Sequence, residues 1–368
     1  MNIGLCGFGV VGRGVYEIVR QRPDMKVKKI LCLEDIQLPD AQTVKDFSEI
    51  LNDPEIDTVV EAMGGLHPSY DFARAALEAG KNVVSSNKAM VCTFYDELIP
   101  LAMHKGVSLR CTAAVGGGIG WLSELERARR VQTINQVGGI MNGTCNYILD
   151  NMTRLGLGYD EALKQAQKLG YAEANPATDV DGIDTWHKVI LSANVAFGIS
   201  LDKTTVPVSG IRNISAADVD CFKAHGKVCK LISTAKRTED GFSAYVQPTL
   251  VDAGSPEGAV PLNYNLITFI GQTSERMSFY GQGAGRYPTA YNVVQDLVDV
   301  TQGKSFYAPY GAPQAADNQE AHRYYVRGDW EGSIQEDWGT GVITAPVPVC
   351  QMHQWVKDHP DAFIAGVD

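Results

Sequence analysis

The chain has 368 residues, of which 45% are hydrophobic and 20% are charged, and its formal net charge is −11. This composition is typical of a folded globular protein and excludes a disordered or fibrous chain, and the length suits two domains better than a single core. Because so acidic a chain repels a phosphate backbone, we expect a small-molecule substrate and no nucleic-acid partner.

The eight cysteines are scattered and form no CxxC pair. This favours free thiols in a reducing compartment over a disulfide framework or a zinc site. No apolar run approaches the roughly 18 residues that a membrane span needs, and no targeting segment precedes the first predicted strand. We therefore expect a cytoplasmic protein without a membrane partner.

A dinucleotide-binding turn is predicted near the N-terminus. An apolar strand over 3–6 leads into a glycine-rich turn, and a helix that stops at Pro23 follows. In such a turn the first glycine makes the bend, the second lets the backbone approach a pyrophosphate, and the third lets helix pack on strand. The helix N-terminus then faces the phosphates. The turn consists of Gly7, Phe8, Gly9, Val10, Val11 and Gly12.

The residues after the next predicted strand bear on the choice of cofactor. A second apolar run over 27–33 follows at βαβ distance and ends in Glu34. A carboxylate there accepts from the adenosine ribose hydroxyls and repels the extra phosphate of NADP, whereas nearby Arg13 weakly favours that phosphate. We expect NAD or NADP, with a lean toward NAD. A glycine-rich turn without a cofactor is the alternative.

Strand and helix patterns alternate through the first third of the chain. Apolar runs over 58–62 and within 80–90 predict strands, and 68–79 predicts a helix. This alternation indicates an α/β fold with a Rossmann-type parallel sheet, whose ligand crevice lies beyond the carboxyl ends of the strands. Asn87 and Lys88 follow one such strand, where Lys88 can meet cofactor or substrate; a solvated surface lysine is the alternative.

Two later segments carry local signals, the first for a tight backbone contact or turn and the second for the start of a helix. Three consecutive glycines within 111–121 require a sharp turn or a tight contact. The triplet 142–144, Asn-Gly-Thr, opens a helix that continues to about Arg154, with Thr144 at or near its N-cap. The Thr144 hydroxyl either caps this helix or binds a ligand held over its N-terminus.

The segment 170–189 concentrates acid around one base. Glu173, Asp179, Asp181 and Asp184 precede Lys188. A helix predicted from about residue 181 to 197 places Asp184 and Lys188 on one face, because they are four residues apart. The alternative is a solvated Asp–Lys pair, with the other acids stabilising the helix N-terminus.

Several motifs together resemble the homoserine dehydrogenase family. They occur in family order between residues 7 and 299. They are GFGVVG, SSNKAM, VGGGI, GIMNGTCNYIL, LGYAEANPATDVDGIDTWHKVIL, AHGKVCKLI and GQGAGRYPTAYNVVQDLVD. The resemblance implies an oxidoreductase that interconverts L-homoserine and L-aspartate 4-semialdehyde with a nicotinamide cofactor, in threonine and methionine biosynthesis.

The resemblance also implies roles for the acid-rich segment. Lys188 matches the general acid/base and Lys88 a second active-site lysine near cofactor and substrate. A lysine surrounded by carboxylates stays protonated, which suits a proton donor and favours reduction at neutral pH. Asp181 has no family counterpart, and the helix dipole explains it. The expected substrate-binding set is Glu173, Asp179, Asp184, Thr144 and Gly170, where Glu173 and Asp179 serve the ammonium group and Asp184 lies beside Lys188.

The family layout implies a discontinuous nucleotide-binding domain, over 1–126 and 284–302. An α+β domain over 127–283 binds substrate and forms a homodimer through its β-rich portion. Gly283 is expected near the nicotinamide, with a tight turn before Pro288 as the alternative. The extension 303–368 is too short for the regulatory ACT module of many relatives, and we expect coil there apart from a helix over 349–357.

Departures from the family pattern leave two questions open. Thr112 stands where relatives carry an acid that helps to hold sodium, which argues against an ion at the backbone of Val115, Gly117 and Ile119. Glu34 stands where NADP-preferring relatives often carry arginine. A divergent member acting on another short amino alcohol or aldehyde is the alternative function, and a non-catalytic cofactor-binding protein is a second one.

Overall fold

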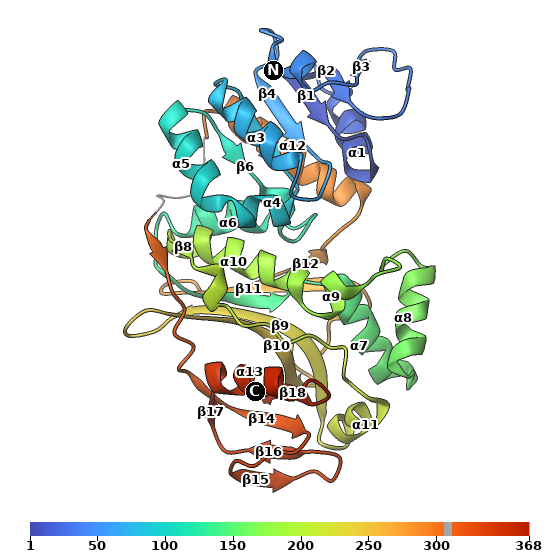
Figure 1. Cartoon of the computed structure of the whole chain (residues 1–368), viewed down its shortest axis with the longest axis vertical. Coiled ribbons are helices and arrows are strands. Elements are labelled where there is room, and N and C mark those ends of the chain that lie inside the picture. The colour runs from blue at the N-terminus through green and yellow to red at the C-terminus, as the bar shows by residue number, and fades with distance from the viewer. Residues whose placement is uncertain (305–310, 368) are drawn as a thin grey trace. The chain divides into compact units, whose positions relative to one another are not determined.

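The computed structural model describes residues 1–304 and 311–367 (Figure 1). The chain divides into two compact units. The first consists of Met1–Val131, Asn194–Ser200 and Gln282–Ala312, and the second of Gln132–Ala193, Leu201–Gly281 and Pro313–Asp368. Residues 305–310 and 368 of the predicted C-terminal extension lie outside the described residues.

The first unit is built on a six-stranded sheet whose neighbouring strands are all parallel. Its order, β3-β2-β1-β4-β5-β6, reverses direction between β1 and β4, which is where doubly wound sheets bind dinucleotides. The strands are β1 (Asn2–Cys6), β2 (Lys26–Leu31), β3 (Gln42–Val44), β4 (Thr58–Glu61), β5 (Asn82–Ser85) and β6 (Leu109–Arg110). The parallel sheet confirms the predicted α/β class.

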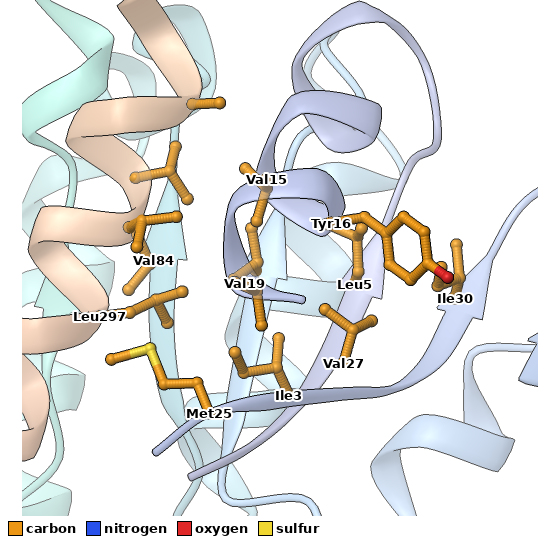
Figure 2. Packing of buried hydrophobic residues seen from close by; sticks show 14 of the residues in the cluster. Ile3, Leu5, Val15, Tyr16, Val19, Met25, Val27, Ile30, Val84 and Leu297 are labelled. Atoms are coloured by element: carbon orange, nitrogen blue, oxygen red, sulfur yellow. The ribbon is translucent and has the colours of Figure 1, made fainter. Parts of the chain in front are cut away.

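Helices cover this sheet, and one of them comes from far along the chain. They are α1 (Val10–Val19), α2 (Ser48–Leu51), α3 (Ser69–Glu78), α4 (Lys88–Thr93), α5 (Tyr95–Lys105), the 3-10 turn η1 (Thr112–Ala114), α6 (Trp121–Ala128) and α12 (Arg286–Thr301). Helix α1 packs Val15 and Val19 onto Ile3 and Leu5 of β1, and Leu297 of α12 joins the same core (Figure 2). Strand and returning helix therefore share one hydrophobic core.

The second unit is built on a mixed sheet with the order β12-β11-β7-β9-β10-β18-β14-β16-β15, and β17 pairs with β14. Its strands are β7 (Ile134–Ile140), β9 (Lys227–Arg237), β10 (Phe242–Asp252), β11 (Tyr264–Gly271), β12 (Glu275–Gln282), β14 (Ala321–Arg327), β15 (Ile334–Asp337), β16 (Val342–Thr344), β17 (Val347–Pro348) and β18 (Phe363–Val367). Strands β8 (Ser200–Leu201) and β13 (Pro313–Gln314) form a separate small sheet.

Helices α7 to α10 carry the motifs of the acid-rich region. The helices that follow β7 in the chain, apart from α12, are α7 (Gly143–Leu155), α8 (Tyr159–Lys168), α9 (Ala177–Val180), α10 (Ile183–Phe197), the 3-10 turn η2 (Lys203–Thr205), α11 (Ala216–Ala224) and α13 (Val349–Asp358). The predicted helices over 143–154 and 181–197 are present as α7 and α10. Among the described residues, no helix is long and apolar enough to cross a bilayer.

The C-terminal tail is not coil. Strand β18 pairs in parallel with β10 and antiparallel with β14, so the tail extends the large sheet. The helix over 349–358 is present, but the expectation of coil around it is wrong. The tail strands β14, β15, β16 and β18 lie in the order β18-β14-β16-β15, which is that of a ferredoxin-like unit. Among the described residues of the tail, the one α-helix is α13, which precedes the last strand.

Candidate active site

The surroundings of the three glycines in the first unit's glycine-rich turn differ: two are tightly packed and one faces open space. Gly7 has a φ of +96°, and a Cβ there would lie 2.7 Å from the carbonyl oxygen of Ala62. A Cβ on Gly12 would lie 2.0 Å from the Gly7 oxygen, so only glycine lets α1 approach the turn this closely. Gly9, the N-cap of α1, has no neighbouring atom within 4 Å of the Cβ position. Open space above a helix N-terminus suits a pyrophosphate.

A cavity of about 490 Å³ opens beside this turn. Phe8 and the stacked rings of Phe47 and Phe72 provide apolar walls, and Glu34 lies at the cavity and pairs with Arg13 at 3.1 Å. The volume falls in the range of cofactor pockets. The residues present therefore fit an adenosine moiety, with an acid where the ribose hydroxyls would be held. Val10 is exposed at the start of α1 and Val11 is half-buried.

Lys88 begins helix α4, directly after the carboxyl end of β5. Asn87 caps this helix, because its side chain accepts from the Met90 N–H at 3.1 Å and donates to the Gly65 carbonyl at 2.6 Å. Asn87 is buried and Lys88 is half-buried. The cap fixes the position of Lys88 just beyond the carboxyl end of β5.

The three consecutive glycines over 116–118 pack against the segment 282–288, which leads into α12. Gly117 has a φ of +46°, and a Cβ there would lie 2.5 Å from the carbonyl oxygen of Gly283. The Gly117 carbonyl itself accepts from the Asn292 side chain at 2.5 Å. This close approach of two backbones explains why residue 117 is glycine.

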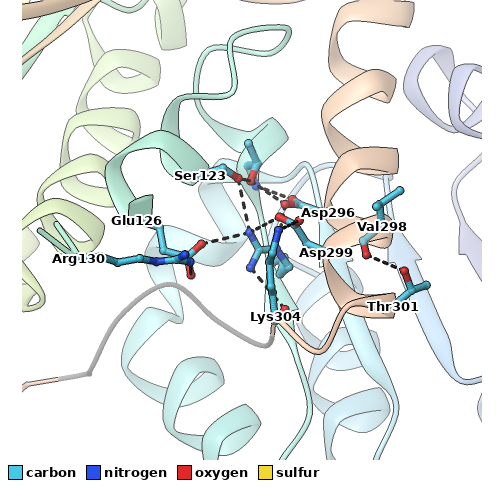
Figure 3. Close-up of polar contacts among 10 residues, drawn as sticks. Ser123, Glu126, Arg130, Asp296, Val298, Asp299, Thr301 and Lys304 are labelled. Carbon is cyan, nitrogen blue, oxygen red and sulfur yellow. Dashed lines mark hydrogen bonds and ion pairs between the residues drawn. The ribbon is translucent and has the colours of Figure 1, made fainter. Parts of the chain in front are cut away.

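The segment considered for sodium carries Thr112 in place of an acid, and Thr112 and Gly117 have partners within the protein. The Thr112 N–H and hydroxyl both donate to Asp296 at 2.7 Å, within the network drawn in Figure 3. Val115 and Ile119 offer only backbone oxygens, and Gly117 already uses its own for Asn292. In the part of the chain that the structure describes, no group of three or more His, Cys, Asp or Glu residues could hold a metal ion.

The second unit buries the Asp184–Lys188 pair on α10. The Lys188 ammonium donates to Asp184 Oδ2 and to the Met141 carbonyl, both at 2.7 Å. The exposed fractions of the two side chains are 9% for Lys188 and 7% for Asp184. The pair is therefore not the solvated one that spacing alone allows. Two of the three ammonium N–H groups are engaged within the protein.

Asn142, which sequence reasoning did not place in the site, connects this pair to the side chain of Asp179. Its Nδ2 group donates to Asp179 Oδ1 and to Asp184 Oδ2, both at 2.7 Å, and its Oδ1 accepts from the Cys145 N–H at 2.8 Å. Asn142 is the N-cap of α7. Thr144 is inside the helix, and its hydroxyl donates to the Tyr171 carbonyl at 2.6 Å. Thr144 is therefore near the N-cap, as expected, while the capping side chain is that of Asn142.

Asp179, the second acid of this cluster, has a perturbed carboxyl group. Burial, and next the charge of Asp184, raise the pKa of its carboxyl group, while the bond from Asn142 opposes the rise. A carboxylate that is buried beside another carboxylate has a strong preference for a cationic partner. The ammonium group of an amino-acid substrate is such a partner.

The remaining predicted residues lie apart from this cluster. Glu173 is exposed on the loop before α9, and its carboxylate has no partner among the described residues. Gly170, with a φ of +76°, directly follows the end of α8. Asp181 precedes α10 and forms a double ion pair with Arg212 at 2.8 and 2.9 Å. The sequence predicts it in the first turn of α10, but it is the C-cap residue of α9, and Arg212 is its observed charged partner.

The fold and these two groups of residues are those of an NAD(P)-dependent oxidoreductase built of two units. Family models support this class over most of the chain: the model for the homoserine dehydrogenase NAD-binding domain matches residues 7–112, and the model for homoserine dehydrogenase matches residues 121–298. The chain belongs to the homoserine dehydrogenase family.

Individual relatives agree with this membership. The chain is 34% identical to homoserine dehydrogenase of Bacillus subtilis over 84% of its length and 76% of that protein. It is 36% identical to the Pseudomonas aeruginosa enzyme over 82% of its length and 72% of that protein. A crystal structure of the Thiobacillus denitrificans enzyme has a TM-score of 0.88 at 27% identity, covering 100% of this chain and 98% of the other. The predicted family and its oxidoreductase activity in amino-acid biosynthesis are confirmed.

Proposed function

We propose that Lys188 is the general acid and base in the NAD(P)-dependent interconversion of L-homoserine and L-aspartate 4-semialdehyde. The observation that carries this role is its buried ammonium group, held by Asp184 and by the Met141 carbonyl with one N–H left over. In reduction, that group donates a proton to the aldehyde oxygen as hydride reaches the carbon. In oxidation, it takes the proton back from the hydroxyl.

The other side chains bind and orient the substrate. Asp179, with its raised pKa, and Glu173 would hold the substrate's ammonium group. Asp184 holds the Lys188 ammonium group in position. Thr144 and Gly170 complete the proposed substrate set. Lys88 is the second proposed active-site lysine, held in place by the capped start of α4.

The nicotinamide cofactor, when bound, supplies or accepts the hydride. Its proposed binding residues are Gly7, Phe8, Gly9, Val10, Val11, Gly12, Glu34, Asn87, Lys88 and Gly283. The open space above Gly9 and the acid at the rim of the cavity support this set and favour NAD. No step is assigned to a sodium ion, because the Thr112 hydroxyl and the Gly117 carbonyl are engaged within the protein.

Two further proposals concern the assembly and its location. We propose a homodimer formed through the β-rich portion of the second unit, and residence in the cytoplasm. The edge strand β12 supports the first, because its exposed Met277 and Tyr280 offer apolar surface beside unpaired backbone groups. The absence of paired CxxC spacing supports the second.

Lys188→Ala tests the catalytic role. Loss of the proton donor should lower kcat for homoserine oxidation by about a hundredfold or more while the KM for the cofactor stays near its original value. Asp181→Asn is the matched control, because Asp181 is an acid of the same segment that bonds Arg212 instead. Near-normal turnover by Lys188→Ala would show that another group transfers the proton.

A further inference from the structure

The Asn142 side chain has a single possible orientation. Its Oδ1 accepts from the Cys145 N–H at the start of α7, so its Nδ2 group must face the opposite way. Both Nδ2 hydrogens are used, one by Asp179 Oδ1 and one by Asp184 Oδ2. The amide is therefore fixed by a helix at one end and by two carboxylates at the other.

The shared oxygen makes this amide part of the acid–base arrangement. Asp184 Oδ2 accepts from both Asn142 and the Lys188 ammonium at 2.7 Å. The Asp184 side chain has other rotamers available, and hydrogen bonds from the two donors select the observed one. Since Lys188 is held by that oxygen, the direction of its ammonium group depends on Asn142 as well.

A neutral donor suits this place better than a cation or an acid. Asp184 is buried and Asp179 is half-buried, and they are close enough that the charge of Asp184 raises the pKa of Asp179. An amide supplies a hydrogen bond to each without adding charge, and so lowers their repulsion while leaving Asp179 negative overall. A fixed lysine in this position would neutralise the group that a substrate ammonium needs.

We propose that Asn142 is a positioning residue of the reaction, which aligns Asp184 with Lys188 and Asp179 with the substrate's ammonium group through one side-chain amide. This assignment rests on the proposed role of Lys188. Asn142 itself touches no reacting atom, and its effect reaches the substrate through the two acids.

Few other titratable groups bear on Asp179. On α10 they are Asp184 and Lys188. On α7 the titratable group is Cys145, and its Sγ donates to the Asp179 carbonyl. Burial raises the pKa of this thiol, so it stays protonated. The neighbouring Asp181 is paired with Arg212. Among the described residues, the groups that act most on Asp179 are therefore the Asp184 carboxylate, Lys188 and the Asn142 and Thr144 side chains.

Asn142→Ser separates the bridging role from helix capping. Serine is a good N-cap, so α7 keeps its cap, but its short hydroxyl cannot donate to both acids. We expect kcat/KM for homoserine to fall about tenfold or more, because hydrogen bonds to charged groups are lost. Cofactor KM and Tm should stay near those of the original protein. Asn142→Ala should show the same fall in kcat/KM together with a lower Tm.

The pH profile gives a readout that a cap alone would not change. Asp179 binds the ammonium group only when it is ionised, and losing the Nδ2 donor raises its pKa further. The acid limb of kcat/KM should therefore move to higher pH in Asn142→Ser. Asn142→Asp, which keeps the length and the cap but adds a third carboxylate, should move the limb further in the same direction.

The outcomes distinguish this proposal from the proposed function. Asn142→Ser and Asn142→Asp could both keep the original kcat/KM and the original acid limb while Lys188→Ala is inactive. That result would reduce Asn142 to a helix cap and leave the role of Lys188 intact. Full activity of Lys188→Ala would overturn both assignments. A moved acid limb in either Asn142 variant with a near-original Tm supports the positioning role.

Discussion

Glu34 and Arg13 form an exposed salt bridge at the cofactor cavity, with side-chain exposed fractions of 74% and 40%. Arg13 also lies over the Phe8 ring, 4.7 Å from its centroid. Exposed ion pairs contribute little to stability, about 0–1 kcal/mol. A ligand can therefore separate this pair at small cost, and whether the acid or the arginine meets the ribose decides the choice of cofactor.

Glu34→Arg should shift the cofactor preference toward NADPH. The substitution replaces a carboxylate that repels the 2′-phosphate with a guanidinium that binds it, next to Arg13. We expect the ratio of kcat/KM for NADPH to that for NADH to rise about tenfold or more. Glu34→Gln, which removes the repulsion without adding a cation, is the control and should give a smaller rise. An unchanged ratio in Glu34→Arg would place the ribose contact elsewhere.

The site was predictable from the sequence where its residues are close along the chain. The spacing of Asp184 and Lys188 requires only one helical turn, and the structure shows this contact. Asn142 is 37 and 42 residues from its two acids, and Asp181 is 31 residues from Arg212. No local pattern specifies such partners. The Asn-Gly-Thr motif did mark a helix start, and the rule that a cap lies outside its helix would have selected Asn142.

Helix α13 ties the C-terminal tail to the large sheet through a buried histidine. His353 Nδ1 lies 3.0 Å from Ser209 Oγ, and Nε2 lies 3.1 Å from Gln247 Oε1 on β10. Met352 of the same helix packs on Tyr324 and Ile364. Burial lowers the pKa of His353 to about 3, because the charged imidazolium would lose its hydration. The tail is therefore docked by a neutral imidazole.

This histidine should make stability depend on pH. The unfolded chain takes up a proton at an ordinary histidine pKa and the folded chain does so only near 3, so stability falls as pH drops through that window. The free energy of unfolding should decrease by about 2 kcal/mol between pH 7 and pH 5 from this group.

Urea titrations of His353→Gln should show less loss over this range than the original protein. His104→Gln, at an exposed position, should leave the loss unchanged. Equal pH dependence of His353→Gln and the original protein would contradict a neutral buried His353.

The strands of the tail could not be predicted from its local sequence. Strands β16 and β17 have three and two residues, and Gly and Pro around them indicate coil. Their hydrogen bonds come from partners chosen by the whole fold: Thr249 of β10 pairs with Gly366 of β18. The helix of the tail was predictable, because its apolar residues recur at helical spacing within ten residues.

At the scale of the molecule, the open edge of the large sheet bears on assembly. β12 is an end strand, and the exposed fractions of Met277 and Tyr280 are 42% and 54%. An open edge with apolar side chains is a template for another chain. Light scattering after gel filtration should give twice the chain mass of 39.9 kDa. The double variant Met277→Lys and Tyr280→Lys should shift the protein toward monomer, and a monomeric original protein would contradict the dimer.

Long-range contacts also hold the first unit together. Arg110 of β6 is fully buried and pairs with Asp296 and Asp299 of α12 at 3.1 and 2.9 Å. Desolvation raises the pKa of Asp296, while Arg110 opposes the rise. Breaking such a pair leaves a buried charge uncompensated, which costs about 3–5 kcal/mol. The return helix is thus held by charge as well as by its apolar face.

The return of α12 has a consequence for synthesis of the protein on the ribosome. Arg110 and Asp296 are 186 residues apart, and the α1 core residues Val15 and Val19 are covered in part by Leu297. The N-terminal unit therefore leaves the ribosome first but cannot finish folding until the residues of α12 emerge. Until then its apolar surface stays open. Most of the second unit is translated in between, so the first unit must wait for that synthesis before its core can close.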